Sequence, residues 1–449
     1  MLLEKPLNLT HENYIEYCLK IAEHKLSSYT SISEIAKDED FINIYENIKF
    51  LEEPKDISIL DEDDLTKDDY KRAVKCILEG RFFTEHAAAG EATRLGIGTK
   101  YMINMQKDLP IEKIAELMSK EKGATVTANE VLEKSKFNPN ALLPFSLGKR
   151  HMLELSFDIS KLAKANGYNP EHVLSKQKML IIVNEVTGDL IINEFIASKF
   201  FGFNPSNVFF MVQKPYHGIS FFNGRFFYDT NSSTRLHNHG QMVIQETMDD
   251  ELFYVDDKGN KRYLKSDEFG EILKNIDNKI SYNIEDLEYL INSIEHLSLA
   301  FALKKSDEGY RMLMEIVGND PINPQKGGMA AFDSIIGRNV MIEGFQLKGI
   351  KNHEIKYLNK NFNQYLKPYE AWFMLKKHGL NMPIAVKNGY IYFQPVQGDI
   401  NFLVKTLFFR RKVLKPIKAW KSPATTPLAI YYMSMQDKQV GFREYAEAF

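Results

Sequence analysis

Two apolar segments decide the fold class of this chain: residues 179–184, Met-Leu-Ile-Ile-Val-Asn, and residues 208–213, Val-Phe-Phe-Met-Val-Gln. Near-continuous apolar runs of this length are typical of strands that are buried on both faces. Residues 188–201 between them have helical periodicity, and Gly202 follows as a stop signal. The strand–helix–strand order predicts a βαβ crossover, and hence an α/β fold with a mostly parallel, Rossmann-like sheet flanked by helices.

Upstream, residues 81–100 read Arg-Phe-Phe-Thr-Glu-His-Ala-Ala-Ala-Gly-Glu-Ala-Thr-Arg-Leu-Gly-Ile-Gly-Thr-Lys. A β-prone segment runs into small residues, and a loop then carries Gly90, Arg94 and Gly96 before Lys100. Small residues let backbone amides approach a phosphate chain closely, while Arg and Lys neutralise its charge. The spacing matches neither the P-loop nor the dinucleotide fingerprint. Two interpretations therefore stay open: a triphosphate cradle and a glycine-bearing surface turn.

Ligands of parallel sheets bind beyond the carboxyl ends of the strands. The loop after Ala88 and the segments after Asn184 and Gln213 each follow such an end. We therefore expect these three segments to face one crevice.

Composition excludes several classes of protein. The 449 residues are 44% hydrophobic and 26% charged, which is ordinary for a globular protein, and the net charge of −3 argues against a nucleic-acid binder. Cys18 and Cys76 are too few for a disulfide framework and indicate buried thiols in a reducing compartment. The polar start and the charges that interrupt every long apolar run predict a cytoplasmic protein without a membrane partner.

Three regions are expected along the chain. Residues 1–75 read as an N-terminal helical region, in which the acidic run 61–64 is a solvated helix start. Residues 76–350 carry the alternating strands and helices, and residues 351–449 form a small α+β region that completes or caps the site. No internal repeat is found.

Nine segments, in order, resemble the type-1 UDP-glucose pyrophosphorylase family, the UTP–sugar-1-phosphate uridylyltransferases. Their collinearity carries the resemblance more than any one motif does. The segments are residues 90–96 with Lys100, 179–187, 208–213, 238–240 (Asn-His-Gly), 283–287 (Asn-Ile-Glu-Asp-Leu), 313–316 (Leu-Met-Glu-Ile), 326–328 (Lys-Gly-Gly), 341–343 (Met-Ile-Glu) and 393–399 (Phe-Gln-Pro-Val-Gln-Gly-Asp).

The resemblance implies a nucleotidyltransferase catalytic domain over residues 76–350. A sugar-1-phosphate oxygen would attack the α-phosphorus of UTP, with Mg²⁺ as cofactor, and pyrophosphate would leave. Such a transfer needs in-line positioning and charge stabilisation more than a covalent nucleophile. Glucose-1-phosphate is the default sugar, and the implied partners are these two small-molecule substrates.

The resemblance also assigns roles to individual residues. Arg94 and Lys100 would be catalytic and hold the triphosphate, and Glu285 would hold Mg²⁺ where the family has Asp. The nucleotide would be bound by Ala89, Gly90, Glu91, Gln213, Asn238 and His239. The sugar would be bound by Asn283, Lys326, Gly327, Gly328 and Glu343.

Without the resemblance, simpler interpretations of these residues stay open. His239 could be an ordinary loop histidine, and Gln213 could simply end a strand. Lys326 could lie in a solvent-exposed hairpin, and Glu285 could be a helix N-terminal carboxylate. Glu343 stands among apolar residues, so without a function it would need a place at a strand edge or a cationic partner.

The chain departs from the family pattern in ways that matter for function. Gln397 falls where the family has a phosphate-binding Lys, and an amide gives up a charge-assisted contact. Lys387, Lys405 or Arg410 would have to compensate. The loop from Arg94 to Lys100 is one residue shorter. Without the hexapeptide-like β-helix repeats of the family, a monomer or weak oligomer is expected. The alternative function is a weakly active or inactive relative that binds nucleotide or sugar as a regulatory module.

Overall fold

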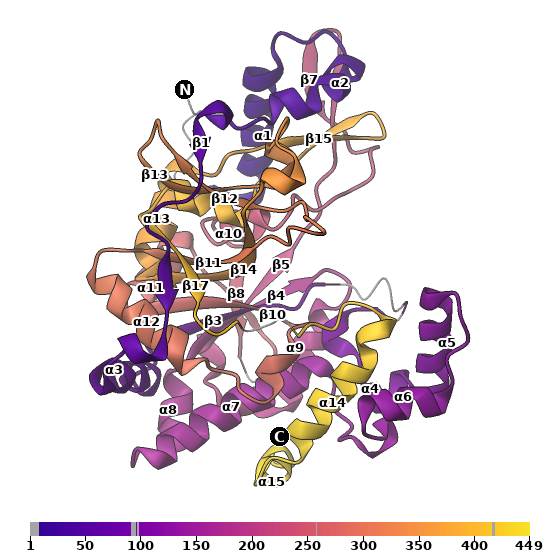
Figure 1. The fold of residues 1–449 in the computed structure, drawn as a ribbon, viewed down its shortest axis with the longest axis vertical. Coiled ribbons are helices and arrows are strands. Elements are labelled where there is room, and N and C mark those ends of the chain that lie inside the picture. The colour runs from indigo at the N-terminus through magenta and orange to yellow at the C-terminus, as the bar shows by residue number, and fades with distance from the viewer. Residues whose placement is uncertain (1–8, 91–95, 97, 257, 415–417) are drawn as a thin grey trace.

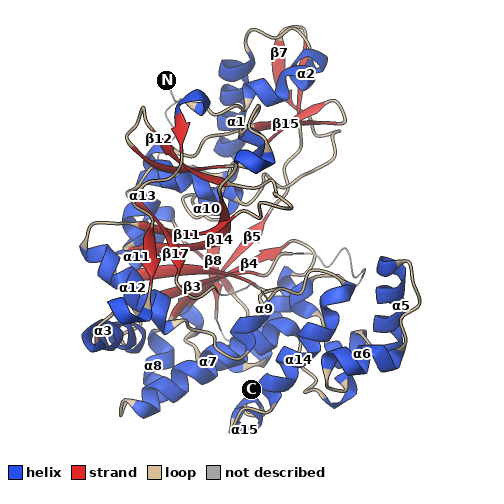
Figure 2. Cartoon of the chain, in the orientation of Figure 1, coloured by secondary structure: helices blue, strands red, loops and turns tan. Residues whose placement is uncertain are grey.

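The computed structural model describes all residues except 1–8, 91–95, 97, 257 and 415–417. Its centre is a sheet of 13 strands with helices on both faces (Figure 1). Ten of the strands follow the order β2-β17-β11-β14-β10-β3-β4-β5-β8-β9, and β1, β12 and β13 join them through the pairing of β12 with β14. A second, antiparallel sheet of four strands, in the order β15-β16-β6-β7, lies at one end of the molecule (Figure 2). The predicted α/β class, with helices flanking the sheet, is confirmed.

The middle of the large sheet is parallel, as the two apolar segments predict. β10 (Asn278–Asn283), β3 (Phe82–Ala87), β4 (Lys178–Asn184) and β5 (Val208–Gln213) pair in parallel. The helix α9 (Gly188–Ala197) connects β4 to β5 and confirms the predicted βαβ unit. Because the four strands point the same way, the loops that follow them leave from one edge of the sheet.

Along this order beyond β10, one strand runs against its neighbours. β14 (Tyr357–Leu366) runs antiparallel between β10 and β11 (Met312–Gly318), and the next strands are again parallel to β11. The other strands are β1 (Leu51–Glu52), β2 (Ser58–Leu60), β6 (Ile219–Phe222), β7 (Arg225–Tyr228), β8 (Leu252–Val255), β9 (Lys261–Tyr263), β12 (Met329–Asp333), β13 (Arg338–Ile342), β15 (Ile384–Lys387), β16 (Tyr390–Phe393) and β17 (Thr406–Arg411).

Two apolar layers bury the faces of the parallel strands. One face packs against a cluster that includes Met152 and Leu153 of α7, and the other packs against Phe269 and Trp372. The helices are α1 (His11–Leu26), α2 (Ile32–Ile42), α3 (Lys67–Leu78), α4 (Met105–Asp108), α5 (Ile111–Lys122), α6 (Ala128–Ser135), α7 (Leu147–Ala165), α8 (Pro170–Lys176), α10 (Gly240–Gln245), α11 (Ser266–Lys274), α12 (His296–Asp307), α13 (Pro368–His378), α14 (Thr426–Asp437) and α15 (Phe442–Ala446).

Residues 1–75 contain more than helices. α1 and α2 pack on the small antiparallel sheet, but β1 and β2 join the large one, and α3 runs across residue 75. The sequence did not reveal β1 and β2 because strands of two and three residues carry no measurable alternation. The acidic run is a short 3₁₀ turn, Glu62–Asp64, that Asp61 caps.

The Met-Ile-Glu segment, residues 341–343, lies at the end of a strand. β13 ends at Ile342, and Glu343 caps the 3₁₀ turn Gly344–Gln346. Both cysteines are buried and free, as expected. Among the described residues, no helix combines the length and apolarity that a membrane crossing requires.

Candidate functional site

The loops that follow β3 and β4 meet at the carboxyl edge of the sheet, as predicted. Asn184 Nδ2 donates to the carbonyl of Ala89 at 2.9 Å, while Asn184 Oδ1 accepts from the backbone amide of Thr187 at 2.8 Å. The hydroxyl groups of Thr99 and Thr187 lie 3.1 Å apart. Gln213 is buried at the end of β5, in register with Asn184. The three expected segments therefore leave from one edge.

The glycine-bearing loop closes on itself at Lys100. The backbone amide of Lys100 donates to the carbonyl of Gly90 at 3.0 Å. Among the described residues, a Cβ atom added to Gly90 would meet nothing within 4 Å, so their packing does not require glycine there. Arg94 and Glu91 lie outside the described residues. Glycine at this position is compatible with a ligand group that approaches the backbone closely.

Lys100 meets Glu285 from the neighbouring parallel strand. The Lys100 ammonium forms an ion pair with Glu285 Oε2, and Lys421 Nζ lies 3.8 Å from Glu285 Oε1. Glu285 follows the end of β10, whose last residue Asn283 is in register with Ala87 of β3. We call Lys100, Glu285 and Lys421 the Lys100 cluster. It holds two cations around one carboxylate at the edge where the loops meet.

Negative charge gathers next to the Lys100 cluster. Burial, followed by the charges of Glu288 and Glu285, raises the pKa of Asp286 to about 7. Asn283 Nδ2 donates to Asp286 Oδ2 at 3.5 Å, which offsets part of this effect. A cation placed here would be favoured, because it would relieve the repulsion among the carboxylates.

Two segments that are more than 150 residues apart in the sequence come together at His239. The backbone amide of Gln397 donates to His239 Nδ1 at 3.2 Å, and that of Gly240 donates to the carbonyl of Pro395 at 3.0 Å. Burial lowers the pKa of His239, so the ring is neutral and Nδ1 can accept. A Cβ on Gly240 would lie 2.3 Å from the Pro395 carbonyl carbon. Glycine is therefore required by close packing at this position.

Asn238 precedes His239 with a φ of 54°, and its Oδ1 accepts from the amide of His239 at 2.8 Å. Asn tolerates this left-handed conformation better than most residues, because its side chain can hydrogen-bond locally. That explains how Asn can stand where the resemblance would place Gly.

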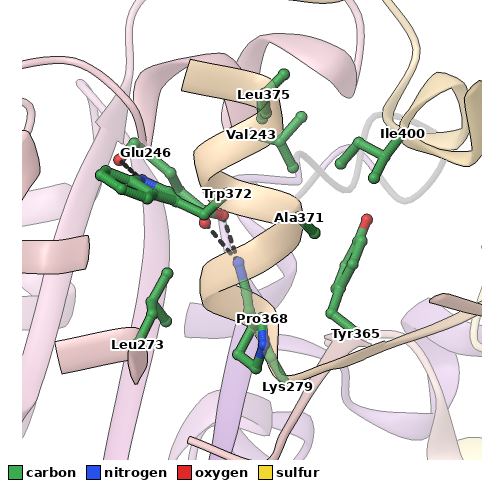
Figure 3. A pocket seen from close by; sticks show the side chains of 10 residues that line it. All are labelled: Val243, Glu246, Leu273, Lys279, Tyr365, Pro368, Ala371, Trp372, Leu375 and Ile400. Atoms are coloured by element: carbon green, nitrogen blue, oxygen red, sulfur yellow. Dashed lines mark hydrogen bonds and ion pairs between the residues drawn. The ribbon is translucent and has the colours of Figure 1, made fainter. Parts of the chain in front are cut away.

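A buried ion pair holds α10, the helix that begins at Gly240. Both oxygens of Glu246 lie 2.6 Å from Lys279 Nζ on β10, and Trp372 Nε1 donates to the Glu246 carbonyl at 2.9 Å (Figure 3). Glu85 Oε2 is also 2.6 Å from Lys279 Nζ. The residues in Figure 3 line a cavity of about 20 Å³, which is room for one water at most. We assign this cluster to anchoring the helix.

The Lys-Gly-Gly loop packs directly on Glu343. A Cβ on Gly344 would lie 3.2 Å from both the Gly327 carbonyl oxygen and Lys326 Cγ, and a Cβ on Gly328 would lie 3.5 Å from Glu343 Oε1. Glu343 is mostly buried, and burial raises its pKa. The Lys326 side chain is exposed. The structure thus brings together two segments that the sequence analysis assigned to the sugar.

Asp399 lies beside this pair. Its two carboxylate oxygens are buried and have no hydrogen-bond partner among the described residues. Burial, and then Glu343, raises the pKa of Asp399 to about 8, while Lys25 opposes the shift. We call Glu343, the loop 326–328 and Asp399 the Glu343 cluster.

Asp399 of the Glu343 cluster lines a pocket of about 470 Å³, together with Gln346 and with Asn43 and Tyr45 from the N-terminal region. Small-molecule sites commonly have about 300–1,000 Å³. The N-terminal region therefore forms one side of a pocket of ligand size.

Several positions at the site were missed from sequence. The amide of Asn359 donates to the Gly328 carbonyl at 2.8 Å and so fixes the glycine loop. No side-chain pattern indicates this contact, because the backbone amide makes it. No sequence pattern indicated a role for Lys421, because its position depends on how the C-terminal tail folds back to the end of β10.

Two of the three cations that were expected to replace a lysine at Gln397 have contacts elsewhere, and the third lies in the small antiparallel sheet. Lys405 Nζ donates to the carbonyl of Glu308 at 3.0 Å, and the Arg410 guanidinium lies 5.3 Å from the Tyr357 ring centroid. Lys387 ends β15 in the small antiparallel sheet. The Gln397 side chain is itself buried, and its Nε2 has no hydrogen-bond partner within the described part of the chain.

Solved structures share this architecture. The uridine diphosphate N-acetylglucosamine pyrophosphorylase of Trypanosoma brucei superposes with a TM-score of 0.56 at 12% identity, covering 95% of this chain and 85% of the other. A UDP-glucose pyrophosphorylase mutant of Leishmania major gives a TM-score of 0.53 at 12% identity, with 92% and 78% covered. The chain has the fold of the UDP-sugar pyrophosphorylases.

A UDP-glucose phosphorylase of Trypanosoma brucei shares this UDP-sugar pyrophosphorylase fold, with a TM-score of 0.52, 11% identity and coverage of 90% and 72%. No protein-family model and no curated protein sequence matches the chain. At these identities the likeness establishes the fold. The activity is inferred from the side chains that the fold brings together.

Proposed function

We propose that the protein transfers UMP from UTP to a sugar-1-phosphate, giving a UDP-sugar and pyrophosphate. One observation carries the proposal: Lys100 and Glu285, from the loops that follow β3 and β10, meet at the edge of the sheet where ligands of α/β folds bind. The solved structures with this fold include pyrophosphorylases of UDP-glucose and of UDP-N-acetylglucosamine.

In the proposed reaction, a phosphate oxygen of the sugar-1-phosphate attacks the α-phosphorus of UTP. The bond from the α-phosphorus to the oxygen that bridges to the β-phosphorus breaks, and both electrons leave with pyrophosphate. Lys100 neutralises the charge that develops on the leaving group, and Arg94 is proposed to assist it. The backbone around Ala89, Gly90 and Glu91 contributes amides. Positioned cations lower such a barrier because they need no reorganisation during the reaction.

The nucleotide base is assigned to the end of β5. The Gln213 amide can both donate and accept, as recognition of uracil requires. Asn238 and neutral His239 are proposed to lie between the base and the phosphates. They share a polypeptide segment with α10, which the Lys279–Glu246 pair anchors to β10.

The sugar is assigned to the Glu343 cluster together with Asn283. Carboxyl groups with raised pKa values can donate as well as accept hydrogen bonds, and this suits the hydroxyl groups of a hexose. Glucose-1-phosphate remains the first candidate, and N-acetylglucosamine-1-phosphate is the second.

The residues at the end of β10 fit a magnesium ion in part. Among the described residues, no group of three or more His, Cys, Asp or Glu side chains could hold a metal alone. Mg²⁺ commonly takes only one or two carboxylates and completes its shell with phosphate oxygens and water. Glu285 would hold it, beside the carboxyl of Asp286. The ion would neutralise phosphate charge, and its binding would release Lys100 from its ion pair with Glu285.

A second candidate function rests on Gln397. A neutral, buried amide at this position favours a weakly active or inactive relative that binds nucleotide or sugar as a regulatory module.

The deciding experiment measures pyrophosphate release with Mg²⁺, offering each nucleoside triphosphate against a panel of sugar-1-phosphates. Release that requires UTP and one sugar, and that collapses in Lys100→Ala, supports the enzyme. UTP binding by calorimetry without turnover would favour the regulatory module. No turnover and no binding would contradict both.

A further inference from the structure

We propose that Lys421, from the tail that follows β17, supplies the second cation of the phosphate site. It would take the place of the lysine that the resembled family has where this chain has Gln397. The inference rests on the proposed function, because it concerns how that site holds phosphate. The positive charge that is missing at Gln397 would then come from another position in the chain.

The first argument is position. Lys421 Nζ lies 3.8 Å from Glu285 Oε1, and Lys100 is paired with the other oxygen of the same carboxylate. Two lysines on one carboxylate leave a net positive charge. An incoming pyrophosphate can take over both ammonium groups, since charge-assisted bonds to phosphate are among the strongest that side chains make.

The second argument is that the backbone beside Lys421 is fixed to the end of β10. The amide of Trp420 donates to the Glu285 carbonyl at 2.8 Å, and the amide of Leu287 donates to the Lys418 carbonyl at 2.8 Å. Asp286 and Ala419 form an antiparallel β-bridge between these bonds. The tail thus adds a short strand to the segment that carries Glu285.

The third argument is the anchoring of this segment in the core. Trp420 is fully buried, and its Nε1 donates to Thr426 Oγ1 at 3.0 Å, at the start of α14. At the other end of α14, Asp437 Oδ1 accepts from buried Arg150 at 2.7 Å. Lys421 therefore stands on a rigid backbone, while its side chain is 56% exposed and free to turn toward a ligand.

Gln397 cannot fill the same role. Its backbone amide donates to His239, and its side chain is buried and carries no charge. Lys421, a C-terminal lysine, does approach the carboxylate of Glu285. Lys412, by contrast, pairs with Asp61 and Asp63 near β2.

The test compares Lys421→Gln with Lys412→Gln in the full chain. Lys412 is the matched control, because it is a C-terminal lysine whose side chain is 53% exposed and pairs with carboxylates, Asp61 and Asp63, away from the Lys100 cluster. We expect the KM for pyrophosphate in the reverse reaction to rise about 10- to 100-fold in Lys421→Gln, with Lys421→Arg recovering most of the loss. The melting temperature should not change, because the side chain is exposed.

A charge-transfer variant sharpens the test. Gln397→Lys in the Lys421→Gln background should restore much of the pyrophosphate affinity, since it returns the cation to the other position. Calorimetry with pyrophosphate alone gives the same comparison without turnover.

The outcomes separate the two proposals. If the wild type turns over and Lys421→Gln behaves like Lys412→Gln, the role of Lys421 is overturned while the enzyme stands. If the wild type neither turns over nor binds pyrophosphate or UTP, the proposed function fails and this inference fails with it.

Discussion

The Lys100 cluster and the Glu343 cluster use ionisable groups in opposite ways. In the first, two lysines share one partly exposed carboxylate, so the cluster keeps a net positive charge and its ion pairs can be exchanged for a ligand's charges. In the second, burial raises the pKa values of Glu343 and Asp399, and the carboxyl oxygens of Asp399 have no partner among the described residues. The first arrangement suits an anion, and the second suits uncharged groups that form hydrogen bonds.

The largest expected effect breaks the Lys100 cluster. Lys100→Met should lower kcat about 100- to 1,000-fold, because a positioned charge that stabilises the leaving group is lost. The measurement is steady-state pyrophosphate release. Lys274→Met serves as the control, since Lys274 pairs with Glu271 on the exposed face of α11 and should leave kcat unchanged. A loss in Lys100→Met of less than tenfold would contradict the assignment.

The next effect separates His239 from the segment that ends at Gln397. A Cβ on Gly240 would overlap the backbone of Pro395, so Gly240→Ala should lower the free energy of unfolding by about 1–3 kcal/mol and reduce activity. Urea denaturation measures the first quantity. Gly318→Ala is the matched control, because a Cβ there would meet nothing within 4 Å. Equal stability of the two variants would show that the contact with Pro395 relaxes at no cost.

A third prediction tests whether the two clusters act on different substrates. Glu343→Gln should raise the KM for the sugar-1-phosphate about 10- to 100-fold, since a hydrogen bond to a charged or ionisable group is lost, and should leave UTP affinity unchanged. Kinetics with the sugar varied and calorimetry with UTP distinguish the two. Glu444→Gln, on the exposed side of α15, is the control. A parallel loss of UTP affinity would mean that the clusters are not separate.

The smallest effect concerns pH. The pKa of Asp399 rises from 3.8 to about 8 on folding, so between these values the folded state binds more protons than the unfolded chain. Stability therefore falls as pH rises through this window. Asp399→Asn should make the decline in melting temperature between about pH 5 and 8 shallower. Glu154, whose pKa is also about 8, preserves part of the slope. An unchanged slope would show that Asp399 does not take up a proton on folding in this pH range.

Sequence reasoning was most successful where side-chain patterns are local. The apolar runs of β4 and β5 and the periodicity of α9 each predicted an element within a few residues of its observed bounds. It failed for β1 and β2, whose pairing partners β12 and β17 lie more than 250 residues away. Short strands are specified by such partners and not by their own composition.

The candidate site shows the same division. The resemblance singled out Lys100, Glu285, His239, Gln397, the loop 326–328 and Glu343, and the structure places them in pairs that touch. It could not predict that Lys100 is paired with Glu285, or that Lys421 approaches the same carboxylate. These contacts join loops and a tail whose paths no local pattern encodes.

The sequence by itself determined the parallel core of this protein, because the spacing of apolar residues specifies buried strands and amphipathic helices. It also determined which polar residues follow the strand ends. Only the tertiary structure decided which of these residues meet and which carboxyl groups are buried away from water. It also decided that the C-terminal tail places Lys421 beside Glu285. Distances between side chains and the burial of charge are properties of the folded chain as a whole, and they set the chemistry of the site.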